Sequence, residues 1–406
     1  MSAQEFDVIV YGASGFTGKL VAEYLLRRYG AEGEVRWAMA GRDEEKLKAV
    51  RAELNAPFAL PIIAAKTSDT GALDALAHRT RVIITTVGPY QRHGEALLAA
   101  CARAGTDYVD LCGEPNWMAA MIEKYEQTAR DSGARIVFSC GFDSIPFDCG
   151  VWFLQREAKA RFGQPLREVR GRVRKMKGSF SGGTAASMMA TFEAIRRDER
   201  VAALMTDPFA LSPTRLRAQP DGETPTEDED LNSWSAPFVM AAINTKNVHR
   251  TNALTGYAYG RDFTYSEMMF TGPGEQGRRR AGAAAGQARM QRALFNFAPT
   301  RALIAQFALP KPGQGPNKEQ RESGMFDVLF AGKTDDGRAL RAGVSGDRDP
   351  GYGSTSKMLA EAALTLKETN RQTTPGGVWT PAAAMGDALI ARLQENAGLR
   401  FTLENA

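Results

Sequence analysis

The chain has 406 residues, a length that favours two domains over a single core. Hydrophobic residues make up 43% and charged residues 24%, as in a soluble globular protein, and no apolar run reaches the roughly eighteen residues of a membrane span. The net charge is only +4 and no basic cluster is interleaved with aromatic residues, so a nucleic-acid partner is not expected.

The cysteines and histidines argue against a metal site. The four cysteines, Cys101, Cys112, Cys140 and Cys149, form no CxxC pair, and the chain has only three histidines. Four thiols without paired spacing suit a reducing compartment. The start, "MSAQEFD", has no charged leader followed by an apolar core. We therefore expect a cytoplasmic protein, with peripheral contact at a membrane left open.

The first predicted element is a buried strand over residues 8–11, followed by a glycine-rich turn and a helix. Glycines recur at every third position in "YGASGFTGKL", and apolar residues then follow at helical period. A strand that turns sharply into a helix aims unpaired N–H groups at a ligand, and this context is typical of pyrophosphate binding. The residues of the turn predicted to bind a dinucleotide are Gly12, Ser14, Gly15, Phe16, Thr17 and Gly18.

The residues at the end of the second predicted strand, residues 35–40, indicate which cofactor is bound. An NAD site usually carries an acid at the end of this strand to hold the ribose 2′-OH. This chain has Arg42 near that position, and a guanidinium can bind a 2′-phosphate with two parallel hydrogen bonds. Lys46 could add a second positive charge, and Asp43 can cap the following helix. The sequence therefore predicts NADP(H).

Strands and helices then alternate to about residue 145, which predicts a doubly wound parallel sheet, the Rossmann architecture. The fourth strand begins at residue 81 and runs into Gly88 and Pro89, where the nicotinamide half of the cofactor should pass. Tyr90 either stacks or donates a proton there, or is an ordinary loop aromatic.

The pattern changes after Pro146, and a second domain is expected over residues 146–350. Residues 167–180 alternate with three arginines on one face, which predicts an antiparallel, half-exposed strand whose arginines are solvated or bind an anion. Residues 219–237 read as a loop and 255–270 as a long strand. Residues 280–316 predict two amphipathic segments that form either a helix pair over the second sheet or a lid or lipid-surface hairpin.

Several motifs together give the chain a resemblance to a known family. They are "YGASGFTGKL", "AGRDEEKL", "TTVGPYQRHGEALLAACARAGTDYVDLCGE", "CGFDSIPFD", "SGGTAASM", "DPGYGSTSKMLAEAAL" and "GGVWTPAAAMGDALI". With these motifs the chain resembles the saccharopine dehydrogenase-like family, in its trans-acting enoyl reductase branch, over nearly its whole length. The resemblance implies NADP(H) and an α+β second domain with a mixed sheet. It also implies C-terminal helices (residues 351–406) that pack back on the first domain (1–145), and an acyl substrate of lipid or glycolipid synthesis.

Reduction of an enoyl thioester needs a hydride at Cβ, a hydrogen bond to the thioester oxygen and a proton at Cα. Asp143 and Ser144 follow a strand of the first sheet and should lie beside the nicotinamide. Gly183 and Thr184 open a helix and could hold an oxyanion or phosphate. We expect Tyr352 or Asp143 to supply the proton. The alternative is that Asp143 and Ser144 only cap a helix and Tyr352 packs between domains.

The sequence thus favours an NADPH-dependent oxidoreductase that reduces an acyl or lipid intermediate. Two alternatives stay open: a non-catalytic NADP(H)-binding adaptor at a lipid surface or in a synthase complex, and an imine or ketone reductase acting on a small molecule. A homodimer is also left open.

Overall fold

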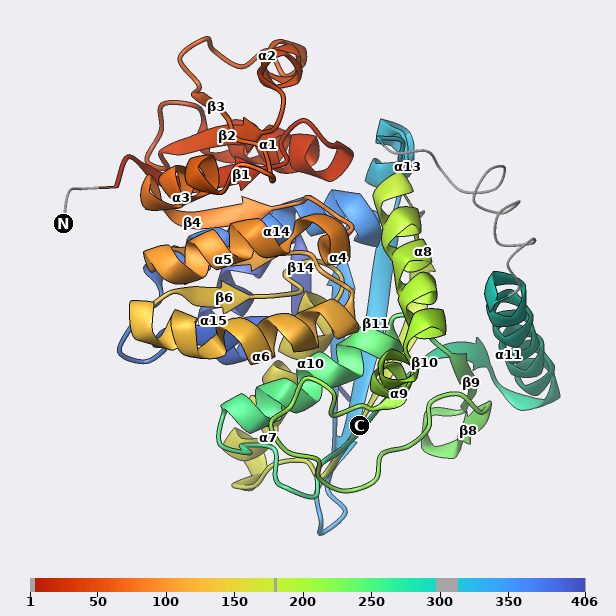
Figure 1. Ribbon diagram of the computed structural model, residues 1–406. Helices are drawn as coiled ribbons and strands as arrows, with labels where there is room; N and C mark the ends of the chain where they lie inside the picture. The colour runs from red at the N-terminus through yellow and green to blue at the C-terminus, as the bar shows by residue number, and fades with distance from the viewer. Residues whose placement is uncertain (1–3, 179–180, 297–312, 406) are drawn as a thin grey trace.

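Strands that are buried on both faces form the first of two seven-stranded sheets (Figure 1) in the computed structural model, which describes residues 4–178, 181–296 and 313–405. The N-terminal elements are β1 (Phe6–Tyr11), α1 (Phe16–Tyr29), β2 (Trp37–Gly41), α2 (Glu44–Glu53), β3 (Ile62–Ala64), α3 (Thr70–His78), β4 (Thr80–Thr85), α4 (Tyr90–His93), α5 (Glu95–Ala104), β5 (Asp107–Asp110), α6 (Pro115–Ser132), β6 (Arg135–Val137) and α7 (Ile145–Phe162).

The later elements leave the first sheet and then return to it. They are β7 (Glu168–Lys177), α8 (Gly182–Arg197), α9 (Glu199–Thr206), β8 (Thr226–Asp228), η1 (Glu229–Leu231), β9 (Ser233–Pro237), α10 (Ala241–Leu254), β10 (Thr264–Gly272), α11 (Gly274–Asn296), α13 (Lys318–Glu322), β11 (Met325–Lys333), β12 (Ala339–Gly346), η2 (Pro350–Ser354), α14 (Thr355–Glu368), β13 (Gly377–Trp379), α15 (Pro381–Arg392), η3 (Leu393–Ala397) and β14 (Leu399–Glu404).

The first sheet is parallel, in the order β3-β2-β1-β4-β5-β6-β13. Side chains alternate across β1: Val8 packs with one set of helices, whereas Ile9 and Tyr11 pack with the other, and all three are buried. Helices α3, α5 and α6 cover one face, and α1, α2 and α14 cover the other (Figure 1). This confirms the predicted doubly wound sheet.

The second sheet has the order β14-β12-β11-β7-β10-β9-β8 and is mixed, as predicted. Its central strand β7 is antiparallel to β11 but parallel to β10, so the prediction of an antiparallel strand holds for one side only. The stretch predicted as a loop, residues 219–237, contains the edge strands β8 and β9.

The three arginines of β7 are neither a solvated face nor a free anion site, which corrects both readings. Arg172 is almost fully buried, and its Nε donates to Asp228 Oδ2 at 2.6 Å. Arg170 Nη1 donates to Asp228 Oδ1 at 2.9 Å, and Arg174 pairs with Asp327 and Glu404. Carboxylates on β8, β11 and β14 of the same sheet neutralise these guanidinium groups, and no charge on them is left for a substrate.

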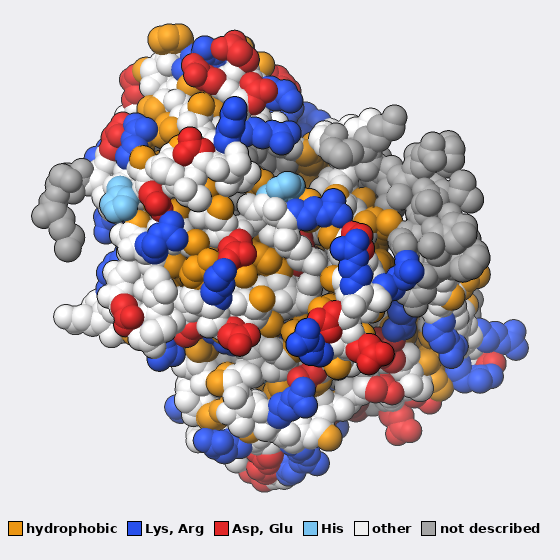
Figure 2. All heavy atoms as spheres, in the orientation of Figure 1, with side chains coloured by type: hydrophobic (Ala, Val, Ile, Leu, Met, Phe, Trp, Pro, Cys, Tyr) orange, Lys and Arg blue, Asp and Glu red, His pale blue; other side chains and the backbone are white. Residues whose placement is uncertain are grey.

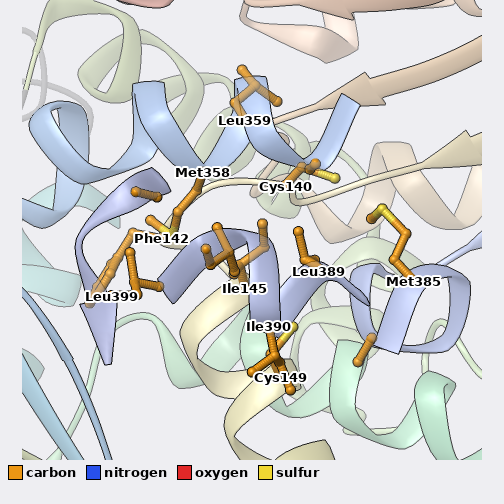
Figure 3. Close-up of a cluster of buried hydrophobic side chains, with 14 of the residues drawn as sticks. Cys140, Phe142, Ile145, Cys149, Met358, Leu359, Met385, Leu389, Ile390 and Leu399 are labelled. Atoms are coloured by element: carbon orange, nitrogen blue, oxygen red, sulfur yellow. The ribbon is translucent and has the colours of Figure 1, made fainter. Parts of the chain in front are cut away.

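A cluster of apolar side chains joins the two domains below the loop that follows β6 (Figure 3). The labelled members come from the β6–α7 region, α14, α15 and β14: Cys140, Phe142, Ile145, Cys149, Met358, Leu359, Met385, Leu389, Ile390 and Leu399. The C-terminal helices therefore pack back on the first domain, as predicted. The sequence did not predict that β13 extends the first sheet and β14 the second. This cluster fixes the loop of residues 140–144 between the sheets.

On the face shown in Figure 2, side chains of both charge signs are interspersed. In the described part of the chain, no helix combines the length and apolarity that crossing a bilayer requires, and no cluster of His, Cys, Asp and Glu could hold a metal. Residues 280–316 lie partly in α11 and partly outside the described residues.

Candidate functional site

The glycine-rich turn brings the start of α1 against the end of β1, where the strand order of the first sheet reverses. Gly12 has φ of 90°, a conformation that favours glycine. A Cβ on Gly18 would lie 2.1 Å from the carbonyl oxygen of Gly12, so only glycine lets the helix approach the strand this closely. In open parallel sheets, ligands bind at such a reversal point, beyond the carboxyl ends of the strands.

The groups at this turn are free to bind an anion. No side chain caps α1, because its N-cap is Gly15, and the first N–H groups of a helix have no partner within the helix. The hydroxyls of Ser14 and Thr17 make no hydrogen bond with any described residue. Phe16 contributes its backbone at the helix start, while its ring packs edge-on against Tyr352, with centroids 5.2 Å apart.

Arg42 follows directly on β2 and is exposed, with no hydrogen bond or ion pair to any described residue. Ser14 Oγ would lie 3.6 Å from a Cβ on Gly41, the residue before Arg42, so the glycine turn and Arg42 are neighbours. Asp43 caps α2 by accepting from the Lys46 amide at 3.1 Å, as predicted, and the Lys46 ammonium lies 3.9 Å from the same carboxylate. The cluster fits a dinucleotide that carries a 2′-phosphate.

The loop after β4 exposes one of its predicted site residues and buries the other two. Gly88 is exposed and lies opposite α8, because a Cβ on it would lie 3.4 Å from Ser187 Oγ. Pro89 is buried and precedes α4. The Tyr90 side chain packs on Trp117, and its hydroxyl donates to the Thr85 carbonyl at 3.1 Å. Of the two readings of Tyr90, the structure favours a packed aromatic.

Asp143 lies in the loop between β6 and α7, at the carboxyl edge of the first sheet. Its Oδ1 is buried, and its carboxyl makes no hydrogen bond with any described residue. Burial alone raises the pKa of Asp143 to about 7, because no donor or cation offsets the loss of water. The residue as a whole is only half-buried, and its carboxyl can hold a proton near neutral pH.

Ser144 is fully buried and stands at the N-cap position of α7, but its hydroxyl does not cap the helix. Instead, Ser144 Oγ accepts a hydrogen bond of 2.8 Å from Asn247 Nδ2 of α10. The capping alternative is therefore not what the structure shows for either Asp143 or Ser144. The loop also docks on the C-terminal segment, since the Phe142 amide donates to Thr355 Oγ1 at 2.9 Å.

Tyr352 and Thr184 meet at the junction of η2 and α8. The Tyr352 hydroxyl accepts from the Ser181 amide at 2.5 Å and lies 2.8 Å from Thr184 Oγ1, with either hydroxyl able to donate. Burial raises the pKa of Tyr352 above its ordinary value, so this phenol keeps its proton at neutral pH. Ser181 Oγ already accepts from the amides of Gly183 and Thr184, so these N–H groups are engaged.

The predicted residues thus form three neighbouring groups along the carboxyl edge of the first sheet. The glycine turn adjoins Arg42, the Phe16 ring joins α1 to Tyr352 and Thr184, and Thr355 joins the loop of Asp143 to the segment that carries Tyr352. In Figure 1, α8 stands beside this edge.

Three functional candidates were not predicted. Asn244 and Asn247 are buried and lie three residues apart on α10, and Glu267 is buried on β10. Their signal is a polar stripe, Asn244, Asn247 and Thr251, in a helix that is otherwise packed into the fold. For Glu267 the signal is a single acid within an apolar strand.

One family model matches the chain. It is that of the saccharopine dehydrogenase NADP-binding domain, and it covers residues 8–137, which include the glycine turn, Arg42 and the loop after β4.

Similar proteins of full length are known from mycobacteria. A protein of Mycobacterium tuberculosis (strain H37Rv) is 42% identical over 96% of each chain, and its name gives a trans-acting enoyl reductase as a provisional assignment. A protein of Mycobacterium bovis (strain BCG Pasteur 1173P2), named trans-acting enoyl reductase, is 39% identical over 96% of each chain.

Among solved structures, the apo saccharopine dehydrogenase (L-Glu forming) of Saccharomyces cerevisiae has a similar fold. The TM-score is 0.53 with 13% identity, and the match covers 98% of this chain and 100% of the yeast chain. At this identity the likeness concerns the fold alone.

Proposed function

The chain belongs to the saccharopine dehydrogenase-like family, in its trans-acting enoyl reductase branch, and we infer that it is an NADPH-dependent enoyl reductase. Its substrate is then an acyl compound with a carbon–carbon double bond beside a carbonyl group. The observation that carries the reaction is Asp143, a half-buried residue whose carboxyl has no hydrogen-bond partner among the described residues, at the edge of the sheet where the cofactor is expected.

We propose that the glycine turn and Arg42 hold the cofactor. The amides at the start of α1, with the hydroxyls of Ser14 and Thr17, would bind the pyrophosphate, and the Arg42 guanidinium would bind the 2′-phosphate. Lys46 would add attraction over a longer distance. Gly88 and Pro89 would border the nicotinamide half, with Gly88 leaving the backbone open to close approach.

When bound between the glycine turn and Arg42, NADPH would supply the hydride that Cβ of the substrate needs. The chain must then provide a proton at Cα and a hydrogen bond to the carbonyl oxygen, where negative charge develops. Asp143 is suited to the proton transfer, because its raised pKa of about 7 leaves a large neutral fraction at physiological pH. After the transfer it is a carboxylate and regains its proton from solvent.

Tyr352 is the proposed donor to the carbonyl oxygen. If the Thr184 hydroxyl donates to Tyr352 Oη, the tyrosine accepts twice, from Ser181 and Thr184, and its own proton can be directed at the substrate. Thr184 would then orient Tyr352, and Ser144, held by Asn247, would fix the position of the adjacent Asp143. The proton at Cα and the hydrogen bond at oxygen would come from different segments, the β6–α7 loop and η2.

The test is steady-state oxidation of NADPH with a panel of enoyl thioesters of rising chain length. The proposal predicts turnover, and a loss of at least a hundredfold in kcat for Asp143→Asn. Asp148→Asn is the control, because Asp148 is a buried acid of similar pKa on α7 whose carboxylate accepts hydrogen bonds from Thr251 and Ala382. Tight NADPH binding without oxidation would support an adaptor instead. Turnover of imines or ketones but not of enoyl thioesters would support the other alternative.

We also propose that the chain can contact a lipid surface and can form a homodimer. Sedimentation with anionic vesicles and analytical ultracentrifugation of the full chain would test them.

A further inference from the structure

Helix α10 connects the loop of Asp143 to a second buried acid. Asn247 Nδ2 donates to Ser144 Oγ at 2.8 Å, and Asn244 Nδ2 donates to Glu267 Oε1 at 2.6 Å. Residues three apart lie on the same side of a helix, about one turn from each other. The two amides therefore hold the β6–α7 loop and β10 on one side of α10.

Glu267 is completely buried, and both of its oxygens accept hydrogen bonds. The second bond comes from the Tyr265 hydroxyl, 2.9 Å from Oε2. Three other side-chain oxygens of this region lack a hydrogen-bond donor. They are buried without a partner among the described residues: Asp143 Oδ1, Asn244 Oδ1 and Asn247 Oδ1. All three are acceptors, and a carboxylic acid proton is a donor that a carboxylate would lack. Protonation of Asp143 or Glu267 would add an O–H donor to a region that has more buried acceptors than donors.

Burial, together with the charge of one acid on the other, also favours the protonated form of Glu267. Burial raises the pKa of Glu267 to about 8, and the charge on Asp143 contributes to the rise. Arg172 of β7 acts in the opposite direction, but its guanidinium is engaged with Asp228. On β10, Tyr265 keeps its proton because burial and Glu267 raise its pKa.

The remaining titratable groups of this region contact other partners. Asp148 of α7 interacts with Tyr265 and accepts from Thr251. On α10, Lys246 donates to the Met205 carbonyl at 2.9 Å, and His249 packs on Phe209.

We propose that Asp143 and Glu267 form a proton-sharing pair, held by Asn244 and Asn247, in which Glu267 keeps Asp143 supplied with a proton into mildly alkaline solution. Two neighbouring buried carboxyls resist being ionised together, so the last proton is distributed over both. Asp143 thus keeps a share of a proton at pH values where, alone, it would have lost it. Glu267 is a positioning residue, and the assignment rests on the proposed role of Asp143 as proton donor.

The first test is the pH profile of kcat for the wild type, Glu267→Gln and Glu267→Asp. In the wild type, activity should fall gradually as both acids ionise. In Glu267→Gln the fall should become a single ionisation centred at lower pH, with kcat at pH 6 within about threefold of the wild type. Glu267→Asp should restore the gradual fall. An unchanged profile, or a loss by the same factor at every pH, would overturn the pairing.

The second test does not need turnover, so it separates failure of the pair from failure of the proposed function. Urea unfolding is measured for the wild type, Asp143→Asn, Glu267→Gln and the double variant at pH 5 and pH 9. At pH 9, the gains in free energy of unfolding of the two single variants should sum to more than the gain of the double variant, because either single substitution already removes the repulsion between the two carboxylates. At pH 5 there is no such repulsion, so the two gains should sum to that of the double variant. The pair Asp143→Asn and Asp148→Asn is the additive control. Additivity of the Asp143 and Glu267 changes at both pH values would refute the proposal. If Glu267→Gln does not fold, Glu267→Met, which is of similar volume, takes its place.

Discussion

Replacing Asp143 with Asn should stabilise the protein at alkaline pH, which is unusual for a change at a buried polar position. The Asp143 carboxyl makes no hydrogen bond with a described residue, so the substitution breaks none that the structure describes. What it removes is a charge that the fold accommodates poorly. The same substitution should abolish the proposed proton transfer, so stability would rise while activity falls.

The magnitude follows from the shift in pKa of Asp143, from 3.8 to about 7. Each unit corresponds to roughly 1.4 kcal/mol, so the folded state loses roughly 4 kcal/mol relative to the unfolded state once the carboxyl is ionised in both. Below about pH 4 the group is protonated in both states and this penalty is absent. Between about pH 4 and pH 7 the unfolded chain has released a proton that the folded protein keeps, so stability falls as pH rises. Above about pH 7 the full penalty is present.

Urea unfolding at pH 5 and pH 8.5 tests this reasoning. The free energy of unfolding of Asp143→Asn, minus that of the wild type, should be about 1 to 2 kcal/mol at pH 5 and about 4 kcal/mol at pH 8.5. Asp148→Asn should gain less, because Asp148 accepts hydrogen bonds from Thr251 and Ala382, and Asn has only one acceptor oxygen. A difference for Asp143→Asn that is the same at both pH values would refute the reasoning.

Three further variants probe the cofactor site and the oxygen donor. Arg42→Ala should weaken NADPH binding about tenfold or more and leave NADH binding unchanged, because one charge-assisted contact contributes about 1.5–3 kcal/mol; calorimetry with both cofactors measures it, and equal loss for both would speak against the assignment. Tyr352→Phe should lower kcat about tenfold or more with little change in NADPH affinity, and unchanged turnover would remove Tyr352 from the mechanism. Gly18→Ala should lower the melting temperature and abolish the stabilisation by NADPH, since its Cβ would lie 2.1 Å from the Gly12 carbonyl oxygen. A thermal-shift assay measures this, and a rise in melting temperature with NADPH equal to that of the wild type would contradict it.

Local signals in the sequence predicted the first sheet and the turn at its centre. The strand–glycine–helix pattern is set by residues close in sequence, because only glycine allows the backbone of Gly12 and the approach of Gly18. The same holds for the Asp43 cap of α2. The mixed second sheet and the returning C-terminal helices were also predicted, both from the family resemblance.

Contacts between distant residues were not predictable in this way. The arginines of β7 look solvent-exposed by their alternation, yet Arg172 is neutralised by Asp228, which lies 56 positions along the chain. Tyr90 lies in a glycine-rich loop but packs on Trp117. The link between Asn247 and Ser144 spans 103 positions. No periodicity or motif indicates such pairings, since they arise only when distant segments of the chain pack together in the fold.

Isotopic labelling of the product tests the central claim most directly. An enoyl thioester is incubated with NADPH carrying deuterium at the transferable C4 position, and separately with unlabelled NADPH in heavy water, and each product is analysed by NMR. The account predicts one deuterium at Cβ from the cofactor and one at Cα from the solvent. Deuterium from the cofactor at a carbonyl or imine carbon, or a cofactor that binds tightly but transfers no label to any acyl substrate, would contradict it.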